Sequence, residues 1–368
     1  MVSEKMVAWG SQGCVIRDLA AYGEQRAAVV GAENVFNFTI GNPSVPAPSC
    51  VRQTIERLLQ TVPAEQLHAY TAAPGLASVR AKMAAYLEKT FGVGYRAEDV
   101  YMTSGASSAL AMLAYALLSP GDEVLTLSPY FSEYKLYAEA AGGTLTAVPS
   151  CPEDFQIDLD AFSAAISEKT AVVLLNSPNN PSGVILSRRS ITKLAELLEK
   201  KSAEYGRRIY IVADEPYREL AYDGEEVPFI PAIYKDTIYC YSFSKTLSLP
   251  GERIGFLAIH PELTDYARVR AAIYGAGRAL GYINASTMFQ LVAAECVGQT
   301  ADISVYKQNR DLIHTALLDM GYTCVKPSGA FYLFLKTPEP DAAAFCKKAM
   351  ALDLLVVPGD EFGCPGYV

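Results

Sequence analysis

The amino-acid sequence predicts an α/β protein with a mostly parallel sheet between helices, and three observations lead to this fold class. Several short segments are almost entirely apolar, which is typical of strands covered on both faces. Segments with helical spacing alternate with these runs, so helices are expected to connect consecutive parallel strands. Hydrophobic residues make up 51% of the 368 residues and charged residues only 19%, which is enough apolar material for a large core.

Each element of the central part is predicted from its local pattern. Strands are expected where apolar and β-branched runs end at Gly, Pro, Asn or Asp, at 99–102, 123–127, 144–148, 171–176, 209–213, 237–241 and 255–259. Helices are expected where apolar residues recur at helical spacing, at 77–90, 107–118, 131–141, 160–167, 190–203 and 261–273.

The pattern changes at about residue 284. A long helical stretch over 285–318 precedes a short strand at 330–335, a helix at 341–352 and an apolar LLVV run. Together these segments predict a smaller α+β unit at the C-terminal end.

Charge and the placement of Cys and His exclude several classes of protein. Acidic residues number 40 and basic residues 31, and the net charge of −9 argues against binding to a nucleic acid. The three histidines lie far apart and the eight cysteines form no C-x-x-C pair, so we expect buried, reduced thiols and no metal site. The N-terminus lacks a signal-peptide core, and the most apolar stretch, 109–118, is about half a membrane span. A soluble, cytoplasmic protein without a membrane partner is expected.

Open α/β sheets bind ligands beyond the carboxyl ends of their strands, so the junctions there are informative. The run TSGAS at 103–107 opens directly into a helix, and it is either a cradle for an anion or an ordinary helix N-cap. The run NSPNNPSG at 176–183 is either a common turn or a rigid turn that points the amide of Asn180 into the crevice.

Two further junctions carry charged residues. Asp214 ends an apolar strand, where a carboxylate either has a cationic partner or caps the next segment, and Tyr217 follows closely. Lys245 follows another apolar strand and precedes Arg253, and a partly desolvated lysine beside a cation has a lowered pKa and attacks carbonyls. Pyridoxal phosphate uses all of these groups, because its ring nitrogen needs a carboxylate and its aldehyde needs a lysine.

These motifs resemble those of the class I and II aminotransferases, which are pyridoxal-phosphate enzymes of fold type I. The resemblance covers essentially the whole chain. It implies a large cofactor-binding domain over 46–284 with a seven-stranded sheet, a small α+β domain over 285–368, and an N-terminal segment, 1–45, that contributes to the small domain and the rim of the active site. The motifs that carry it are IGNPSVPAP (40–48), AYTAAPGLASVR (69–80), TSGASSAL (103–110), NSPNNPSG (176–183), ADEPY (213–217) and SFSKTLSLPGERIG (242–255).

The resemblance assigns roles around the reacting end of the cofactor. Lys245 would form a Schiff base with pyridoxal 5'-phosphate and then carry the proton between the substrate and the cofactor. Asp214 would pair with the ring nitrogen, and Asn180 and Tyr217 would hold the phenolic oxygen. Gly41 would approach the substrate carboxylate through its backbone, and Asn180 is a second substrate-binding candidate.

The phosphate end follows from the same resemblance. Ser242 and Arg253 would bind the phosphate, together with the helix start at Gly105, Ala106 and Ser107. These residues give the TSGAS run a function beyond that of an N-cap.

Three further positions are informative when set against the family pattern. Phe131 takes the place where the family stacks an aromatic ring on the cofactor, and it is a mild departure because many members have Trp there. Tyr70 resembles the tyrosine that reaches the phosphate of the neighbouring subunit, so a homodimer with shared active sites is implied. The family carries an arginine for the substrate carboxylate after a segment like 358–368. Either the natural protein lacks this arginine or the small domain is incomplete at its C-terminal end, and we expect the second.

The activity implied by the resemblance is transfer of an amino group from an L-amino acid to a 2-oxo acid. A pyridoxal-phosphate-dependent carbon–sulfur β-lyase shares the same cofactor residues and is the first alternative. A non-catalytic sensor domain that binds the cofactor is the second, although such regulators carry a DNA-binding extension ahead of the domain. Aromatic, alanine-like and aspartate-like donors all remain open, because no residue marks a clamp for a second carboxylate.

Overall fold

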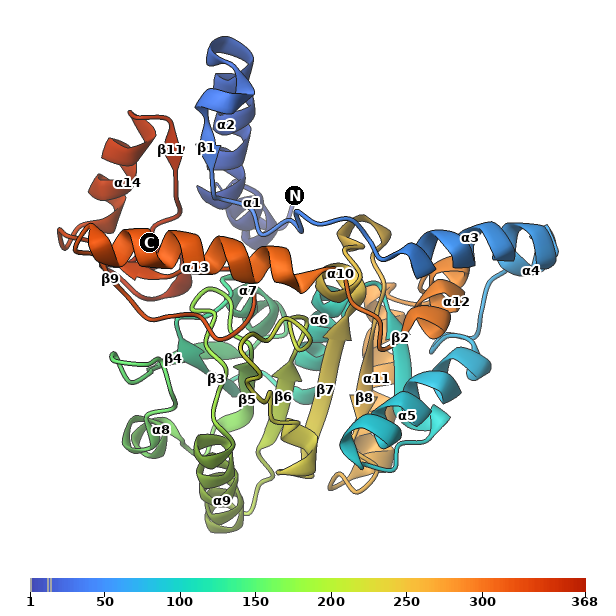
Figure 1. Ribbon diagram of the computed structural model, residues 1–368. Helices are drawn as coiled ribbons and strands as arrows, with labels where there is room; N and C mark the ends of the chain where they lie inside the picture. The colour runs from blue at the N-terminus through green and yellow to red at the C-terminus, as the bar shows by residue number, and fades with distance from the viewer. Residues whose placement is uncertain (1, 12, 14) are drawn as a thin grey trace.

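The computed structural model describes residues 2–11, 13 and 15–368, and a seven-stranded sheet forms its centre (Figure 1). The strand order is β2-β8-β7-β6-β5-β3-β4. Neighbouring strands are parallel, except that β8 is antiparallel to both β2 and β7. The predicted α/β fold with a mostly parallel sheet is confirmed. The strands are β2 (Val100–Thr103), β3 (Glu123–Ser128), β4 (Thr144–Pro149), β5 (Thr170–Asn176), β6 (Tyr210–Asp214), β7 (Thr237–Ser242) and β8 (Gly255–Ile259).

Helices cover both faces of this sheet, which explains why its strands are apolar without alternation. Met112 of α6, Tyr134 of α7 and Ile273 of α11 are buried against one face. Met83 of α5 and Leu198 of α9 are buried against the other. The helices around the sheet are α3 (Ser49–Thr61), α5 (Ala77–Phe91), α6 (Ala106–Leu117), α7 (Glu133–Ala140), α8 (Leu159–Ala165), α9 (Arg188–Tyr205), α11 (Tyr266–Leu280) and α12 (Thr287–Cys296).

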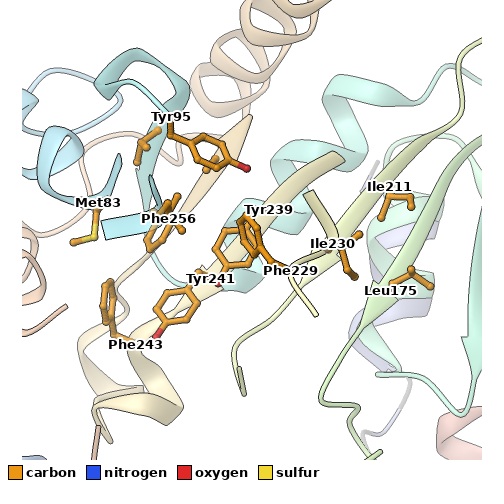
Figure 2. Packing of buried hydrophobic residues seen from close by; sticks show 14 of the residues in the cluster. Met83, Tyr95, Leu175, Ile211, Phe229, Ile230, Tyr239, Tyr241, Phe243 and Phe256 are labelled. Atoms are coloured by element: carbon orange, nitrogen blue, oxygen red, sulfur yellow. The ribbon is translucent and has the colours of Figure 1, made fainter. Parts of the chain in front are cut away.

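Aromatic side chains from β7, β8 and α10 (Phe243–Thr246) form part of the core, as Figure 2 shows. The ring of Tyr241 meets Phe243 edge to face at 5.1 Å between centroids and lies 5.3 Å from Phe256. Such pairs contribute about 0.5–1.5 kcal/mol beyond the burial of their area. Phe243 is the first residue of α10 and is 1% exposed, so this packing anchors the short helix that carries Lys245.

The single helical stretch expected over 285–318 is wrong, because two helices, α12 and α13 (Ile303–Asp319), lie there. Gly298 interrupts the helical path with a φ of 83°. The N–H group of Ala301 then donates to the carbonyl group of Thr246 at 2.7 Å. This bond ties the chain between the two helices to the end of α10, and the backbone leaves the helical conformation to make it.

The C-terminal unit lies above the carboxyl ends of the large sheet (Figure 1). β10 pairs with β9, and β11 pairs with β1, so a strand of the N-terminal segment joins this unit. The strand expected at 330–335 begins only at its last residue. The N–H groups of Gly329 and Ala330 donate instead to the carbonyls of Gly183 and Leu220, both at 2.8 Å, which holds this segment as a turn on the large domain. The elements are β1 (Phe36–Asn37), β9 (Thr323–Cys324), β10 (Leu335–Lys336), β11 (Leu354–Leu355) and α14 (Ala342–Met350). The domain limits at 45 and 284 stay a prediction.

The N-terminal region contains helices that the sequence pattern does not single out. These are α1 (Glu4–Ser11), α2 (Val15–Val30), α3 (Ser49–Thr61) and α4 (Ala64–Leu67). Cys240, Cys296 and Cys346 are buried thiols, the other described cysteines are partly exposed, and Cys14 lies outside the described residues. Among the helices of residues 2–11, 13 and 15–368, none combines the length and the apolar character needed to cross a bilayer.

Candidate active site

A cavity of about 920 Å³ lies at the carboxyl ends of the central strands. Asn176, Asp214 and Ser242, the last residues of β5, β6 and β7, all line it. This is the place where parallel strands of an open sheet present a ligand site. Ten of the twelve residues proposed from the sequence line the cavity: Gly41, Ala106, Ser107, Phe131, Asn180, Asp214, Tyr217, Ser242, Lys245 and Arg253.

Lys245 is held on α10, whose first turn is capped by Ser242. The Oγ of Ser242 accepts a hydrogen bond from the N–H group of Ser244 at 3.2 Å. The Nζ of Lys245 donates to the carbonyl oxygen of Gly41 at 2.5 Å. Burial, together with the positive charge of Arg253, lowers the pKa of Lys245 to about 8. A useful fraction of this amine is therefore uncharged near neutral pH and able to act as a nucleophile.

Asp214 ends β6 and is 4% exposed. The hydroxyl group of Tyr134 donates to its Oδ2 at 2.5 Å, whereas its Oδ1 has no hydrogen-bond partner in the described part of the chain. Burial raises the pKa of Asp214 to about 7, and the hydrogen bond from Tyr134 opposes this rise. Because a buried oxygen without a partner is costly, Oδ1 suits a cationic N–H group of a ligand.

Asn180 and Tyr217 lie together beside Asp214. Burial raises the pKa of Tyr217 well above its usual value, and a hydrogen bond with the side chain of Asn180 opposes this. Asn176 fixes both segments: its amide donates to the carbonyl of Asp214 at 2.8 Å, and its Oδ1 accepts from the N–H group of Asn180 at 2.6 Å. The loop after β5 is thereby held against the end of β6.

The opposite end of the cavity is suited to an anion. The guanidinium group of Arg253 donates to the carbonyls of Pro250 at 2.9 Å and Ser104 at 3.4 Å. Gly105, with a φ of 84°, makes room for this group, because a Cβ there would lie 2.7 Å from Nη2 of Arg253. The first N–H groups of α6 have no intrahelical partner and carry the positive end of the helix dipole. Gly105 itself packs against the guanidinium group of Arg253 and is not among the residues that line the cavity.

Tyrosines that the sequence analysis does not single out complete the site. The hydroxyl group of Tyr332 lies 2.7 Å from that of Tyr217 and fills the space where a side chain at position 41 would be, which explains the glycine there. Tyr134 stands on α7, three residues after Phe131. Neither tyrosine lies at a strand-to-loop junction. The available signals were the aromatic run FYLF at 331–334 and the helical spacing of SPYFSEY.

Comparison with known proteins places these observations in a family. The sequence profile of aminotransferase class I and II matches residues 33–368. The chain belongs to this family. It is 50% identical to an amino transferase of known structure from Eubacterium rectale, with a TM-score of 0.97 over 100% of this chain and 92% of that one. It is also 30% identical over 348 residues to the aspartate aminotransferase of Thermotoga maritima, covering 93% of this chain and 88% of that protein.

A third comparison concerns the aspartate aminotransferase from Thermus thermophilus, whose structure was determined with maleate. It is 27% identical to this aminotransferase, with a TM-score of 0.86 over 100% of this chain and 94% of that one. The likeness therefore extends over both the large sheet and the C-terminal unit.

Two aromatic residues of this aminotransferase take different positions relative to the cavity. Phe131 lines it and meets Tyr134 edge to face at 5.5 Å between centroids. Tyr70 is 94% exposed on the segment between α4 and α5 and is not part of the lining. The structure thus does not bring Tyr70 into the site of its own chain.

Proposed function

We propose that this aminotransferase uses pyridoxal 5'-phosphate to transfer an amino group from an L-amino acid to a 2-oxo acid, with Lys245 as the residue that binds the cofactor. The observation that carries the proposal is the carboxylate of Asp214, whose Oδ1 is buried without a partner at the cavity that also holds the Lys245 amine. A cofactor with a ring nitrogen and an aldehyde uses both groups.

The remaining residues fit the same cofactor. Arg253 and the start of α6 form an anion site for its phosphate, with Ser242 and Ser244 beside it. Tyr217 with Asn180 suits the phenolic oxygen. When bound, the cofactor supplies an aldehyde that reacts with amines and a ring that withdraws electrons from the substrate Cα.

The chain's own groups then handle the protons. Lys245 Nζ would take a proton from the substrate Cα and deliver it to the former aldehyde carbon of the cofactor, and a pKa of about 8 suits that exchange near neutral pH. Asp214 is held as a carboxylate once a cationic N–H group lies at Oδ1, because a positive neighbour lowers its pKa. Gly41 lines the same cavity as Lys245, and its backbone N–H group would approach the substrate carboxylate there.

Aspartate is the first donor to test. The relatives that are 29 or 30% identical include proteins named aspartate aminotransferase and aspartate/prephenate aminotransferase. A panel of aspartate, alanine and tyrosine, each with a 2-oxo acid acceptor, covers the donor classes that the sequence leaves open.

A homodimer is also part of the proposal. Tyr70 is a large aromatic residue that is 94% exposed and outside its own cavity, which suits a residue that reaches the phosphate of a second subunit. Tyr70→Phe should weaken cofactor binding without changing the mass measured by light scattering, which should be that of two chains. A monomer with full activity would overturn this part.

Absorbance and turnover test the assignment of Lys245. The purified protein with pyridoxal phosphate should show a visible cofactor band that bleaches with an amino donor and recovers with a 2-oxo acid. Lys245→Ala should abolish turnover, whereas Lys89→Ala, at an exposed lysine of α5, should not. Amino-acid breakdown that needs no 2-oxo acid would indicate the lyase alternative instead.

A further inference from the structure

Tyr332 approaches Tyr217 from a different part of the chain, and their hydroxyl oxygens are 2.7 Å apart. Tyr217 follows β6 of the large sheet, whereas Tyr332 lies on the turn before β10 of the C-terminal unit. Both line the cavity. In the described part of the chain, the hydroxyl of Tyr217 is the hydrogen-bond partner of the Tyr332 hydroxyl.

The position of the Tyr332 hydroxyl is fixed from several sides. The ring of Tyr332 lies edge to face with that of Tyr217, with 5.5 Å between centroids, and 5.0 Å from that of Phe331. Gly41 leaves the space that the hydroxyl fills, and a Cβ at Gly183 would lie 3.0 Å from the Tyr332 carbonyl. The rings of Tyr217 and Phe331 restrict the Tyr332 side chain, because another rotamer would have to displace them.

The turn that carries Tyr332 is itself bound to the large domain through its backbone. Besides the bonds of Gly329 and Ala330 to Gly183 and Leu220, the N–H group of Tyr222 donates to the carbonyl of Ser328 at 2.9 Å, and the Tyr222 hydroxyl donates to the carbonyl of Ala330. The distance between the two tyrosine hydroxyls is therefore set by the fold.

A neutral tyrosine has one proton to donate, and this decides the direction of the contact. If Tyr217 gives its proton to an oxyanion in the cavity, the 2.7 Å contact is a hydrogen bond only when Tyr332 is the donor. We propose that Tyr332 is a positioning residue, whose hydroxyl donates to Tyr217 and so directs the Tyr217 proton to the phenolic oxygen of the cofactor. This inference rests on the proposed function.

Such a chain strengthens the donor at its end, because each hydrogen bond polarises the next. Both hydroxyls keep their protons near neutral pH, since burial raises the pKa of Tyr332 to about 12 and that of Tyr217 well above its usual value. The charged groups that face Tyr217 are Asp214 of β6 and Lys245 of α10, and removing the Tyr332 hydroxyl leaves both in place.

The test is a pH titration of the visible absorbance of the bound cofactor, whose phenolic oxygen shares a proton with the Lys245 nitrogen. A stronger donor at that oxygen stabilises its negative charge and lowers the pH midpoint. Tyr332→Phe should raise the midpoint by about half a pH unit, and Tyr217→Phe by about one unit or more. The Tyr217→Phe, Tyr332→Phe double variant should match Tyr217→Phe alone, because Tyr332 acts through Tyr217.

Tyr222→Phe is the matched control. It removes one hydrogen bond to the same turn, while the backbone bonds of that turn and the Tyr332 hydroxyl remain, so it should lower the melting temperature and shift the midpoint much less than Tyr332→Phe does. Equal shifts in Tyr222→Phe and Tyr332→Phe would overturn the inference, since both effects would then come from the turn.

A second variant tests the same contact if Tyr332→Phe does not fold. Gly41→Ala places a methyl group where the Tyr332 hydroxyl lies and should also raise the midpoint. If the cofactor band of the wild-type protein titrates but the midpoints of the variants are unchanged, the positioning role of Tyr332 is overturned and the proposed function is not. A wild-type protein without any cofactor band would overturn the proposed function itself.

Discussion

The hydroxyl group of Tyr134 donates a 2.5 Å hydrogen bond to Oδ2 of Asp214, one of the two oxygens of this buried carboxyl group. The other oxygen, Oδ1, is buried and unpartnered in the described part of the chain. One neutral donor thus orients a carboxyl group and still leaves it unsatisfied. The site holds a free acceptor that a ligand can use.

Removing this donor should weaken cofactor binding. In Tyr134→Phe the carboxylate of Asp214 loses a hydrogen bond to a charged group, worth about 1.5–3 kcal/mol. The pKa of Asp214 should rise further, and the dissociation constant of pyridoxal phosphate, measured by absorbance titration, should increase by about tenfold or more. Tyr210→Phe, at the other end of β6, should leave it unchanged. An equal loss in both variants would show that the effect is one of general stability.

The raised pKa of Asp214 should also make the cofactor-free protein less stable at higher pH. The folded carboxyl group keeps its proton up to about pH 7, whereas the unfolded chain loses it near 3.8. The folded state binds more protons between these values, so this contribution is present below about pH 4 and is lost as the pH rises through 7, on the order of a few kcal/mol. Between about pH 5 and pH 8, the melting temperature should therefore fall less steeply with rising pH for Asp214→Asn than for the natural protein. Identical slopes would contradict the raised pKa.

The anion site should need a glycine at position 105 because a side chain there would displace Arg253, and not only because the backbone has a positive φ. A methyl group there would lie 2.7 Å from Nη2 of Arg253 and would displace the guanidinium. Gly105→Ala should weaken pyridoxal phosphate binding by about tenfold or more. Gly121→Ala is the matched control, because Gly121 also has a positive φ, 92°, but an added Cβ would meet nothing within 4 Å. It should lose stability and keep cofactor affinity.

Arg253 should discriminate between phosphorylated and unphosphorylated ligands. Arg253→Gln removes a charge-assisted bond to the phosphate, so the affinity for pyridoxal phosphate should fall by about ten- to a hundredfold. The affinity for pyridoxal, which has no phosphate, should change little. If the variant loses affinity for pyridoxal phosphate only, Arg253 acts through the phosphate. An equal loss of affinity for both ligands would show that Arg253 does not bind the phosphate.

The large sheet follows from the sequence because burial on both faces leaves each strand a continuous apolar run. The limits of α11 do not follow so directly. A helix is predicted over 261–273, but α11 begins at Tyr266 because Asp236 holds the preceding turn, accepting from the N–H group of Thr264 at 2.6 Å. Asp236 is distant from Thr264 in the sequence, so the local spacing of apolar residues does not indicate where the helix begins.

The residues of the candidate site also fall into those that the sequence predicts and those that it does not. Asp214 and Lys245 follow from their strand ends, because parallel strands bring those ends to one edge of the sheet. Tyr134 and Tyr332 do not, since each reaches the site from a helix or a turn, and the contact of Tyr332 with Tyr217 spans 115 residues. Their roles depend on tertiary packing, for which a local motif is no guide.

The turn around Ser328 and Ala330 has a mechanical consequence. It belongs to the C-terminal unit by sequence, yet its backbone is hydrogen-bonded to loops of the large domain at Gly183, Leu220 and Tyr222. If α13 and α14 rotate relative to the large sheet, the bending has to occur on either side of this turn. In such a rotation Tyr332 would keep its contact with Tyr217, because the turn that carries it is bonded to the loops of the large sheet.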